Sequence, residues 1–439
     1  MKSIALLSFG MIASAIGLVG FCANAQIVDR VVINASTQCS ASTQCPVEKL
    51  INALEEMPNR IVAGRPVHIV VELCDVDLNL TGHSLSILGN RSLIASPACA
   101  RGPRTQPSLV PRIYVEDPRG LSDPLFQIRN DNVLFSGFRL EGPTRGIGSG
   151  DDRLERGIWI SPFDVDQMSR LPEPIRSIEI SNMEIFHWSG AGINVSDNTD
   201  VAERGRLFNT NEAAVRIKNN FIHHNRHFDG NGYGVEVDDG AYALIEQNVF
   251  DENRHAIAGG SSDVGAKDFA GYTLRDNLIL SGGGLHCGSA SIFSLCWRTH
   301  QIDMHGNKST VFGGQACCGT AGETIIIERN TILYTGGPVP GTGSGWIQGY
   351  AIKIRGNPTD KAVVDGNVFK HASPSDAIAQ NGEPGFGDNI TNPIDVRKNN
   401  VFRGQSICRA WQLRFPWRWA AGSVHGDRRH LVGAVTRYA

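Results

Sequence analysis

The chain has 439 residues, of which 41% are hydrophobic and 19% charged; this is enough apolar material for a large core and excludes wholesale disorder. Lys and Arg number 41 against 44 Asp and Glu, a formal net charge of -3, so the chain lacks the basic excess typical of nucleic-acid binding. The 49 Gly and 20 Pro residues indicate many turns and argue against a mainly helical protein.

Residues 1–25 have the three parts of a secretory signal peptide. Lys2 provides a positive charge, an apolar run reaches Phe21, and residues 23–25 (Ala-Asn-Ala) form a small-x-small cleavage site. No other stretch has the ~18 consecutive apolar residues that cross a bilayer. We therefore predict a secreted or periplasmic protein that begins at Gln26 after cleavage and has no integral membrane segment.

Export to an oxidising compartment favours disulfides among the cysteines that remain after cleavage. Their connectivity does not follow from the sequence. The local pairs that we expect are Cys39 with Cys45, Cys74 with Cys99, and Cys287 with Cys296. Ten cysteines less Cys22 of the signal leave nine, so at least one stays unpaired or intermolecular, and Cys408 is our candidate.

The segment 26–64 is expected to cap the N-terminal end of the repeat region that comes after it. Within this segment, residues 46–56 have the pattern of a short amphipathic helix, with Pro46 near its start. Such a helix would shield the open end of an apolar interior.

A short pattern recurs along the chain: an apolar residue, two polar residues, Asn, any residue, and a second apolar residue. Two degenerate copies lie at residues 135–140 and 180–185. The six full copies are centred on Asn220, Asn248, Asn277, Asn330, Asn367 and Asn399, at spacings of 28, 29, 53, 37 and 32 residues. A repeat of this period indicates a solenoid rather than several separate domains.

Each copy is expected to form two short strands joined by a tight bend. The Asn suits a left-handed bend residue, and stacked coils would align these side chains in a ladder. A third strand lies between successive copies, at residues 192–195, 234–237, 256–259, 301–304 and 351–354. Three strands per coil predict an all-β fold, a right-handed parallel β-helix over residues 65–402. The pattern resembles the pectate-lyase-like superfamily of β-helix proteins, and this resemblance implies a polysaccharide as the partner.

Residues 403–439 carry no Asn repeat and hold seven Arg, no Lys and a single acidic residue, Asp427. We expect either an atypical basic C-terminal cap or a change of reading frame near Gly404, and we place no site in this tail.

The third strands can be aligned on Ile193, Val235, Ile257, Ile302 and Ile352 as equivalent inward residues of coils stacked about 4.8 Å apart. The next position then reads Asn194, Glu236, Ala258, Asp303 and Lys353. Three positions on, the residues are Ser196, Asp238, Gly260, His305 and Arg355. Two positions before, they are Ala191, Tyr233, His255, His300 and Tyr350. This outward face concentrates acids, histidines and cations, a combination that suits proton transfer.

Two kinds of role are predicted on this face. Catalytic roles are predicted for His255, His305, Arg254, Tyr233 and Asp303. Substrate contacts are predicted for Glu236, Asp238, His300, Lys353, His224 and Arg226. No metal ligand set is assigned and no cofactor is established, although Glu236, Asp238 and Asp239 are candidate ligands of Ca²⁺. The chain is expected to be a monomer. Solvated turn histidines and a hydrogen-bonded structural stack are the alternatives to these roles.

The leading interpretation is a polysaccharide lyase that acts on a uronic-acid polymer by β-elimination. This reaction needs a cation for the substrate carboxylate, a base for the C5 proton and an acid for the leaving oxygen. Arg254, Lys353 or a bound cation would neutralise the carboxylate. His255 or His305 would be the base, and Tyr233 the acid.

Three alternatives stay open. Asp303-Met304-His305 is similar to the Asp-x-His core of alginate C5-epimerases, without their Pro and second Asp. Glycoside hydrolysis would use two carboxylates, and Glu236 and Asp303 lie two coils, about 9.6 Å, apart. A non-catalytic polysaccharide-binding protein or adhesin is the third alternative.

Overall fold

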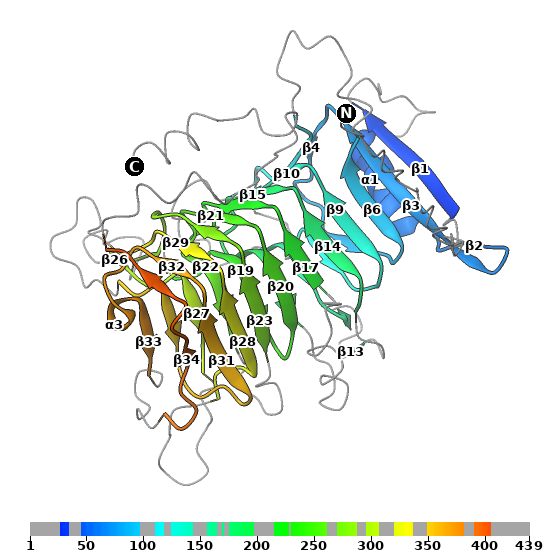
Figure 1. Ribbon diagram of the computed structural model, residues 1–439. Helices are drawn as coiled ribbons and strands as arrows, with labels where there is room; N and C mark the ends of the chain where they lie inside the picture. The colour runs from blue at the N-terminus through cyan, green and yellow to red at the C-terminus, as the bar shows by residue number, and fades with distance from the viewer. Residues whose placement is uncertain are drawn as a thin grey trace, which may run out of the picture.

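The computed structural model describes residues 27–34, 45–96, 110–117, 124–143, 156–164, 169–170, 175–196, 215–227, 230–260, 270–287, 296–306, 320–336, 349–381 and 390–404. These residues form a parallel β-helix with three strands per coil, as predicted. Figure 1 shows the coils stacked one on another from the N-terminal to the C-terminal end. Each coil contributes one strand to each of three sheets, so the strands next to one another within a sheet come from successive coils.

The three sheets contain the following strands. The first sheet holds β1 (Ile27–Asn34), β2 (Ile61–Val62), β3 (Arg65–Cys74), β6 (Arg91–Ala95), β9 (Val133–Ser136), β14 (Ile178–Ser181), β17 (Val215–Lys218), β20 (Tyr242–Glu246), β23 (Gly271–Arg275), β28 (Thr324–Glu328), β31 (Lys361–Asp365) and β34 (Asp395–Val396). The second sheet holds β4 (Asp77–Asn79), β7 (Arg112–Tyr114), β10 (Arg139–Glu141), β15 (Glu184–Phe186), β18 (Phe221–His223), β21 (Val249–Asp251), β24 (Leu278–Ile279), β29 (Thr331–Ile332), β32 (Val368–Phe369) and β35 (Val401–Phe402). The third sheet holds β5 (Leu85–Ile87), β8 (Phe126–Ile128), β11 (Arg156–Ile160), β16 (Ala191–Ser196), β19 (Tyr233–Asp238), β22 (His255–Gly259), β27 (Ile302–Met304), β30 (Ile352–Ile354) and β33 (Ile378–Gln380).

Two hairpins lie outside these sheets: β12 (Phe163–Asp164) with β13 (Ser169–Arg170), and β25 (Leu285–Cys287) with β26 (Cys296–Arg298). The second hairpin is part of the long insertion that the repeat spacing predicts between Asn277 and Asn330. The helices among the described residues are α1 (Pro46–Ile51), the π-helical turn η1 (Asn52–Glu56) and α3 (Pro374–Ala377). Among the described residues, no helix has the length and apolar character needed to cross a membrane.

The predicted N-terminal helix is confirmed as α1 followed by η1. Pro46 opens α1, and the Glu48 carboxylate accepts a hydrogen bond from the Cys45 backbone N–H at 3.0 Å. Leu50 and Leu54 are fully buried and belong to the same apolar cluster as the lumen of the β-helix. The first sheet nevertheless begins before this helix, because β1 pairs in parallel with β3 inside the segment expected to form only a cap.

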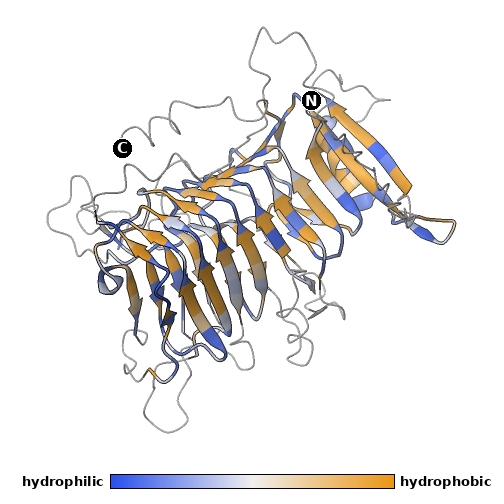
Figure 2. Ribbon diagram, viewed as in Figure 1, coloured by the Kyte–Doolittle hydropathy of each residue, from blue (hydrophilic) through white to orange (hydrophobic). Residues whose placement is uncertain are grey.

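The interior of the β-helix is a stack of equivalent apolar side chains. Parallel pairing keeps the register from coil to coil, so that each inward position lies above its counterpart. One such row in the first sheet is Ile217, Ile245, Leu274, Ile327 and Val364, each 0% exposed. Figure 2 shows apolar residues running along the strands and polar residues gathering at their ends. Burial of these rows is the main stabilising contribution to the fold.

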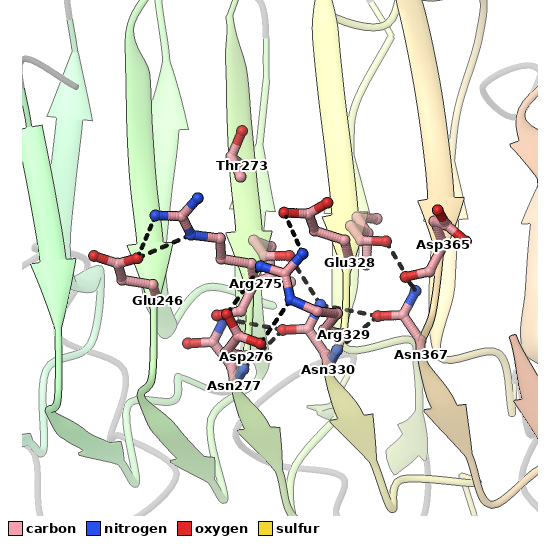
Figure 3. A network of polar contacts seen from close by, with 12 residues as sticks. Glu246, Thr273, Arg275, Asp276, Asn277, Glu328, Arg329, Asn330, Asp365 and Asn367 are labelled. Carbon is pink, nitrogen blue, oxygen red and sulfur yellow. Dashed lines mark hydrogen bonds and ion pairs between the residues drawn. The ribbon is translucent and has the colours of Figure 1, made fainter. Parts of the chain in front are cut away.

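The predicted Asn ladder is confirmed at the corner between the first and second sheets. Each side-chain amide Nδ2 donates to the Oδ1 of the Asn in the next coil, at 3.0 Å, along the series Asn220, Asn248, Asn277, Asn330 and Asn367. Figure 3 shows the last three of these residues side by side. The same Oδ1 atoms accept from the backbone N–H of the preceding member, which satisfies a buried donor at every turn.

Two details of the ladder prediction are wrong. The last member is Asn400, whose Oδ1 accepts from Asn367 Nδ2 at 3.1 Å, whereas Asn399 is exposed and donates to the Asp365 carboxylate. The corner at Asn400 contains one residue more than the same corner of the earlier coils. The Asn that joins the ladder is the residue directly before the strand of the second sheet, here β35. From Asn220 to Asn367 the left-handed conformation also falls on the residue before the ladder Asn, as at Asn219 (φ 55°) and Gln247 (φ 57°).

A second, shorter Asn ladder lies at the corner between the second and third sheets. Asn225 Nδ2 donates to Asn253 Oδ1 at 2.8 Å, and Asn253 Nδ2 donates to the Ile222 carbonyl at 2.8 Å. Both residues lie five positions after the first-ladder Asn of their own coil, a repeated spacing that would have revealed this ladder. Its hydrogen bonds fix the corner from which β19 and β22 start.

Several predictions fall outside the described residues. They concern the signal peptide and Gln26, the tail beyond Gly404, and the cysteines Cys39, Cys99 and Cys408. The pairs Cys39–Cys45 and Cys74–Cys99 each include one of these cysteines and stay predictions. In the hairpin, the antiparallel register places Cys287 directly opposite Cys296.

Candidate functional site

The register predicted for the third strands is the register observed. Ile193 pairs with Val235, Val235 with Ile257, Ile257 with Ile302, and Ile302 with Ile352. Tyr233 pairs with His255. The side chains of one outward position therefore stack along the third sheet, one per coil.

Three aromatic rings stack where the chain enters this sheet. The Tyr233 and His255 rings are nearly parallel, with centroids 5.7 Å apart, and the His255 and His300 rings are 4.4 Å apart. His255 Nδ1–H donates to the His300 carbonyl at 2.6 Å, so the lone pair of the neutral ring is on Nε2. This Nε2 is buried and has no hydrogen-bond partner among the described residues.

Asp303 is the centre of the site. Its Oδ2 lies 2.7 Å from His305 Nε2, 3.0 Å from Arg355 Nη2 and 3.5 Å from His255 Nε2. Its Oδ1 lies 3.1 Å from His300 Nε2, and the side chain is 0% exposed. Three imidazoles and a guanidinium thus surround one buried carboxylate.

The charge distribution of this cluster is set by its contacts. Burial alone would raise the pKa of Asp303, but Arg355, His300 and His305 hold it well below its ordinary value. Burial, with a smaller contribution from Arg254, lowers the pKa of His255 well below 6.5. Burial also lowers the pKa of His300 to about 4. At neutral pH the buried part of the cluster is therefore one carboxylate beside two neutral imidazoles.

Much of the face expected to be open is in fact buried. The His255, His300 and Asp303 side chains are 0% exposed, and Arg254 and Lys353 are 6% exposed. His305, in contrast, has 38% of its side chain exposed. A base that meets a substrate is therefore His305 rather than His255.

Arg355 is the functional candidate that the sequence-based assignment left out. Its Nη1 donates to His305 Nδ1 at 3.2 Å, and its Nη2 donates to Asp303 Oδ2 at 3.0 Å. The register puts Arg355 in the same column as His305, so the signal was present. Arg254 and Lys353 were preferred as cations, but both lie deeper than Arg355.

A second acidic group lies two coils before Asp303. Asn194 Nδ2 donates to Glu236 Oε2 at 2.9 Å and to Asp238 Oδ2 at 3.3 Å. Burial, reinforced by the charge of Asp238, raises the pKa of Glu236 to about 8, while burial and Asp239 raise the pKa of Asp238 to about 6. The two carboxyls therefore titrate as a coupled pair whose pKa values are both raised.

Two predicted contacts do not join this site. His224 lies at the end of β18, with its Nδ1 2.7 Å from His223 Nδ1. Arg226 donates to the Glu252 carboxylate at 3.1 Å. Both belong to the corner between the second and third sheets, beside the shorter Asn ladder.

One group of described residues has the composition of a metal centre. The ligand atoms of His255, His300 and Asp303 all lie within 4.8 Å of one another. However, Arg355 Nη2 is 3.2 Å from His300 Nε2 and 3.0 Å from Asp303 Oδ2, so its guanidinium already balances this carboxylate. A divalent cation would have to displace it, and the cluster fits proton handling better. The Ca²⁺ site at Glu236, Asp238 and Asp239 stays a prediction.

No family model, no curated protein and no solved structure matches this chain. The function must therefore be inferred from the geometry of the cluster itself.

Proposed function

We propose that this protein is a secreted polysaccharide lyase that cleaves a uronic-acid polymer by β-elimination. The observation that carries the proposal is the His305–Asp303–Arg355 arrangement. It combines a partly exposed imidazole, a buried carboxylate that orients the imidazole, and a cation beside both. These are the base and the carboxylate-binding group that abstraction of the C5 proton requires.

The hydrogen bonds define the working tautomer of His305. Its Nε2–H donates to Asp303 at 2.7 Å, and its Nδ1 accepts from Arg355 at 3.2 Å. When a uronate carboxylate binds the Arg355 guanidinium, the donor is drawn away from Nδ1. The Nδ1 lone pair then becomes available to the C5 proton.

Asp303 has two effects on this step. It holds the imidazole by the nitrogen opposite to the reacting one, and it stabilises the imidazolium that forms. Its own pKa is held well below the ordinary value, chiefly by Arg355 against the effect of burial, so it stays ionised throughout. The arrangement is the same physical solution as any carboxylate–histidine pair that works as a general base.

Hydrolysis by the pair Glu236 and Asp303 is less well supported. A hydrolytic base must present a carboxylate oxygen to a water molecule at the substrate, and Asp303 is 0% exposed and engaged by Arg355 and His305. Epimerisation shares the proton abstraction and differs only in the step after it, where a proton returns to C5 from the other face. The geometry therefore favours chemistry that begins at C5.

The test is a panel of polygalacturonate, alginate, polyglucuronate and neutral glycans with the purified mature protein. Elimination produces absorbance near 235 nm, whereas hydrolysis produces reducing ends without it. We expect activity on a uronate polymer, and a loss of about 10²–10⁴-fold in His305→Gln with the fold intact. Glu179→Gln on the first sheet, whose carboxylate pairs with Lys218 at 2.8 Å, is the matched control. Activity on neutral glycans alone would overturn the proposal.

A further inference from the structure

Two tyrosine side chains lie in the lumen of the β-helix at the level of the candidate site. Tyr272, on β23, and Tyr334, two residues after β29, are each 0% exposed and belong to the apolar cluster of the lumen. Tyr272 stacks between Ala243 and Ile325 of the neighbouring coils. A hydroxyl buried in such surroundings costs free energy unless it is hydrogen-bonded, and phenylalanine would fill the same space without it. Packing of the lumen therefore does not account for the two hydroxyl groups.

Both hydroxyls donate to the backbone of one five-residue segment, which runs from Thr299 to Asp303. Tyr272 Oη donates to the Asp303 carbonyl at 3.0 Å, and Tyr334 Oη donates to the Thr299 carbonyl. The same segment carries the His300 ring and the Asp303 carboxylate of the candidate site. Its lumen side is thus held by a hydrogen bond at each end.

This segment has less support from strand pairing than its neighbours. Its strand, β27, pairs with β30 along its whole length but with β22 at the single pair Ile257 and Ile302. The shorter Asn ladder, which fixes the start of β19 and β22, does not continue here, because the residue five positions after Asn277 is Gly282. The tyrosine hydroxyls therefore hold the part of the third sheet where the other devices of the fold are weakest.

Two glycines provide the space for these tyrosines. A Cβ built on Gly284, which has φ 73°, would overlap the Tyr334 hydroxyl, and the Gly284 carbonyl accepts from the Thr299 N–H at 2.8 Å. A Cβ built on Gly259 would lie 3.2 Å from Tyr272 Cε1, closer than an ordinary contact. Both rings thus fit closely beside the backbone of the third-sheet corner and its strands.

We propose that Tyr272 and Tyr334 are positioning residues that fix the Asp303 carboxylate against His305 and Arg355. The inference rests on the proposed lyase function and deepens the account of its site. Asp303 Oδ2 lies 2.7 Å from His305 Nε2 and 3.0 Å from Arg355 Nη2, and these distances depend on where the backbone of residue 303 lies. A displacement of about 1 Å at a reacting group can lower a rate by about 10²-fold.

The experiment removes single hydroxyl groups. The variants are Tyr272→Phe and Tyr334→Phe, and the matched control is Tyr242→Phe, whose hydroxyl is hydrogen-bonded to Thr273 Oγ1 between two strands of the first sheet. Elimination of the uronate polymer that the panel identifies is followed near 235 nm over a range of substrate concentrations, which gives kcat and KM. Urea unfolding establishes that each variant is folded. Tyr272→Phe is also made in an Asp303→Asn background.

We expect Tyr272→Phe and Tyr334→Phe each to lower kcat at least about 10-fold with KM within about 3-fold, and Tyr242→Phe to keep kcat within about 2-fold of wild type. In the Asp303→Asn background, Tyr272→Phe should lower kcat by no more than about 3-fold further, because a residue that acts through Asp303 has no carboxylate left to position. If Tyr272→Phe does not fold, Tyr334→Phe decides by the same limits.

Three results would overturn the inference and leave the lyase proposal standing. They are a normal kcat in folded Tyr272→Phe, an equal loss of kcat in Tyr242→Phe, and an undiminished effect of Tyr272→Phe in the Asp303→Asn background. A wild-type protein that eliminates no uronate polymer would instead refute the lyase proposal, and this inference with it.

Discussion

The substitution Asn277→Ala tests how much the Asn ladder contributes to stability. Asn277 Nδ2 donates to the carbonyls of Ile245 and Arg275 at 2.9 Å and to Asn330 Oδ1 at 3.0 Å. Its Oδ1 accepts from the backbone N–H and the Nδ2 of Asn248, at 2.8 and 3.0 Å. The alanine variant leaves the buried Asn248 N–H without its acceptor.

The expected loss of stability can be worked out from these contacts. An orphaned buried N–H costs roughly 1–3 kcal/mol, and the other lost hydrogen bonds add about 1 kcal/mol net, so we expect a loss of about 2–4 kcal/mol. Asn399→Ala is the matched control, because Asn399 is exposed and makes one surface hydrogen bond at 3.0 Å. It should change the free energy of unfolding by no more than about 0.5 kcal/mol.

The assay is equilibrium urea unfolding of both variants beside wild type, with m-values compared to establish that the same surface unfolds. The Asn277→Asp variant keeps the acceptor oxygen but turns the donor into a second oxygen facing three acceptors. It should lose at least as much stability as Asn277→Ala. Equal losses in Asn277→Ala and Asn399→Ala would refute this account of the ladder.

Two further predictions concern the ring stack and the hairpin. Burial lowers the pKa of His300 from 6.5 to about 4, so as the pH falls through this window only the unfolded state takes up the proton and stability falls by about 3 kcal/mol. In His300→Gln the free energy of urea unfolding should therefore fall by this amount less between pH 7 and pH 4 than in wild type. The same pH dependence as in wild type would contradict the prediction. Cys287 lies opposite Cys296 in the antiparallel hairpin, and residues paired in this way are within the Cα separation that a disulfide spans. Peptide mapping under non-reducing conditions should therefore find the two cysteines linked. Alkylation of both thiols in the native protein would disprove the pair.

The repeat made the fold predictable from sequence. Because side chains in a solenoid stack coil on coil, a single recurring Asn fixes which residues share a corner, and the alignment of Tyr233 on His255 followed from it. The prediction of Asn399 instead of Asn400 was wrong because the position of the Asn was counted in residues from the end of the preceding strand. The corner keeps its Asn next to the following strand and absorbs the extra residue before it.

The site was only partly predictable, since a register gives neighbours and not depth. Asp303 was placed beside His305 correctly, but its burial depends on four groups that converge from three coils. The importance of Arg355 likewise comes from where its long side chain ends. A column of residues does not contain that information, because a guanidinium can reach a neighbouring coil or solvent from the same backbone position.

The first Asn ladder also determines where this protein can change in length. At its corner the loop stays at two residues from coil to coil, between β17 and β18, β20 and β21, β23 and β24, β28 and β29, and β31 and β32. Along these coils the Asn residues that bond to one another are separated by 28 to 53 positions of chain, so the additional residues enter at the other corners. The last corner, before Asn400, is the exception. A foreign peptide grafted into the β25–β26 connection would therefore leave the pitch of the solenoid unchanged, whereas the same peptide placed before Asn277 would separate the two halves of the stack.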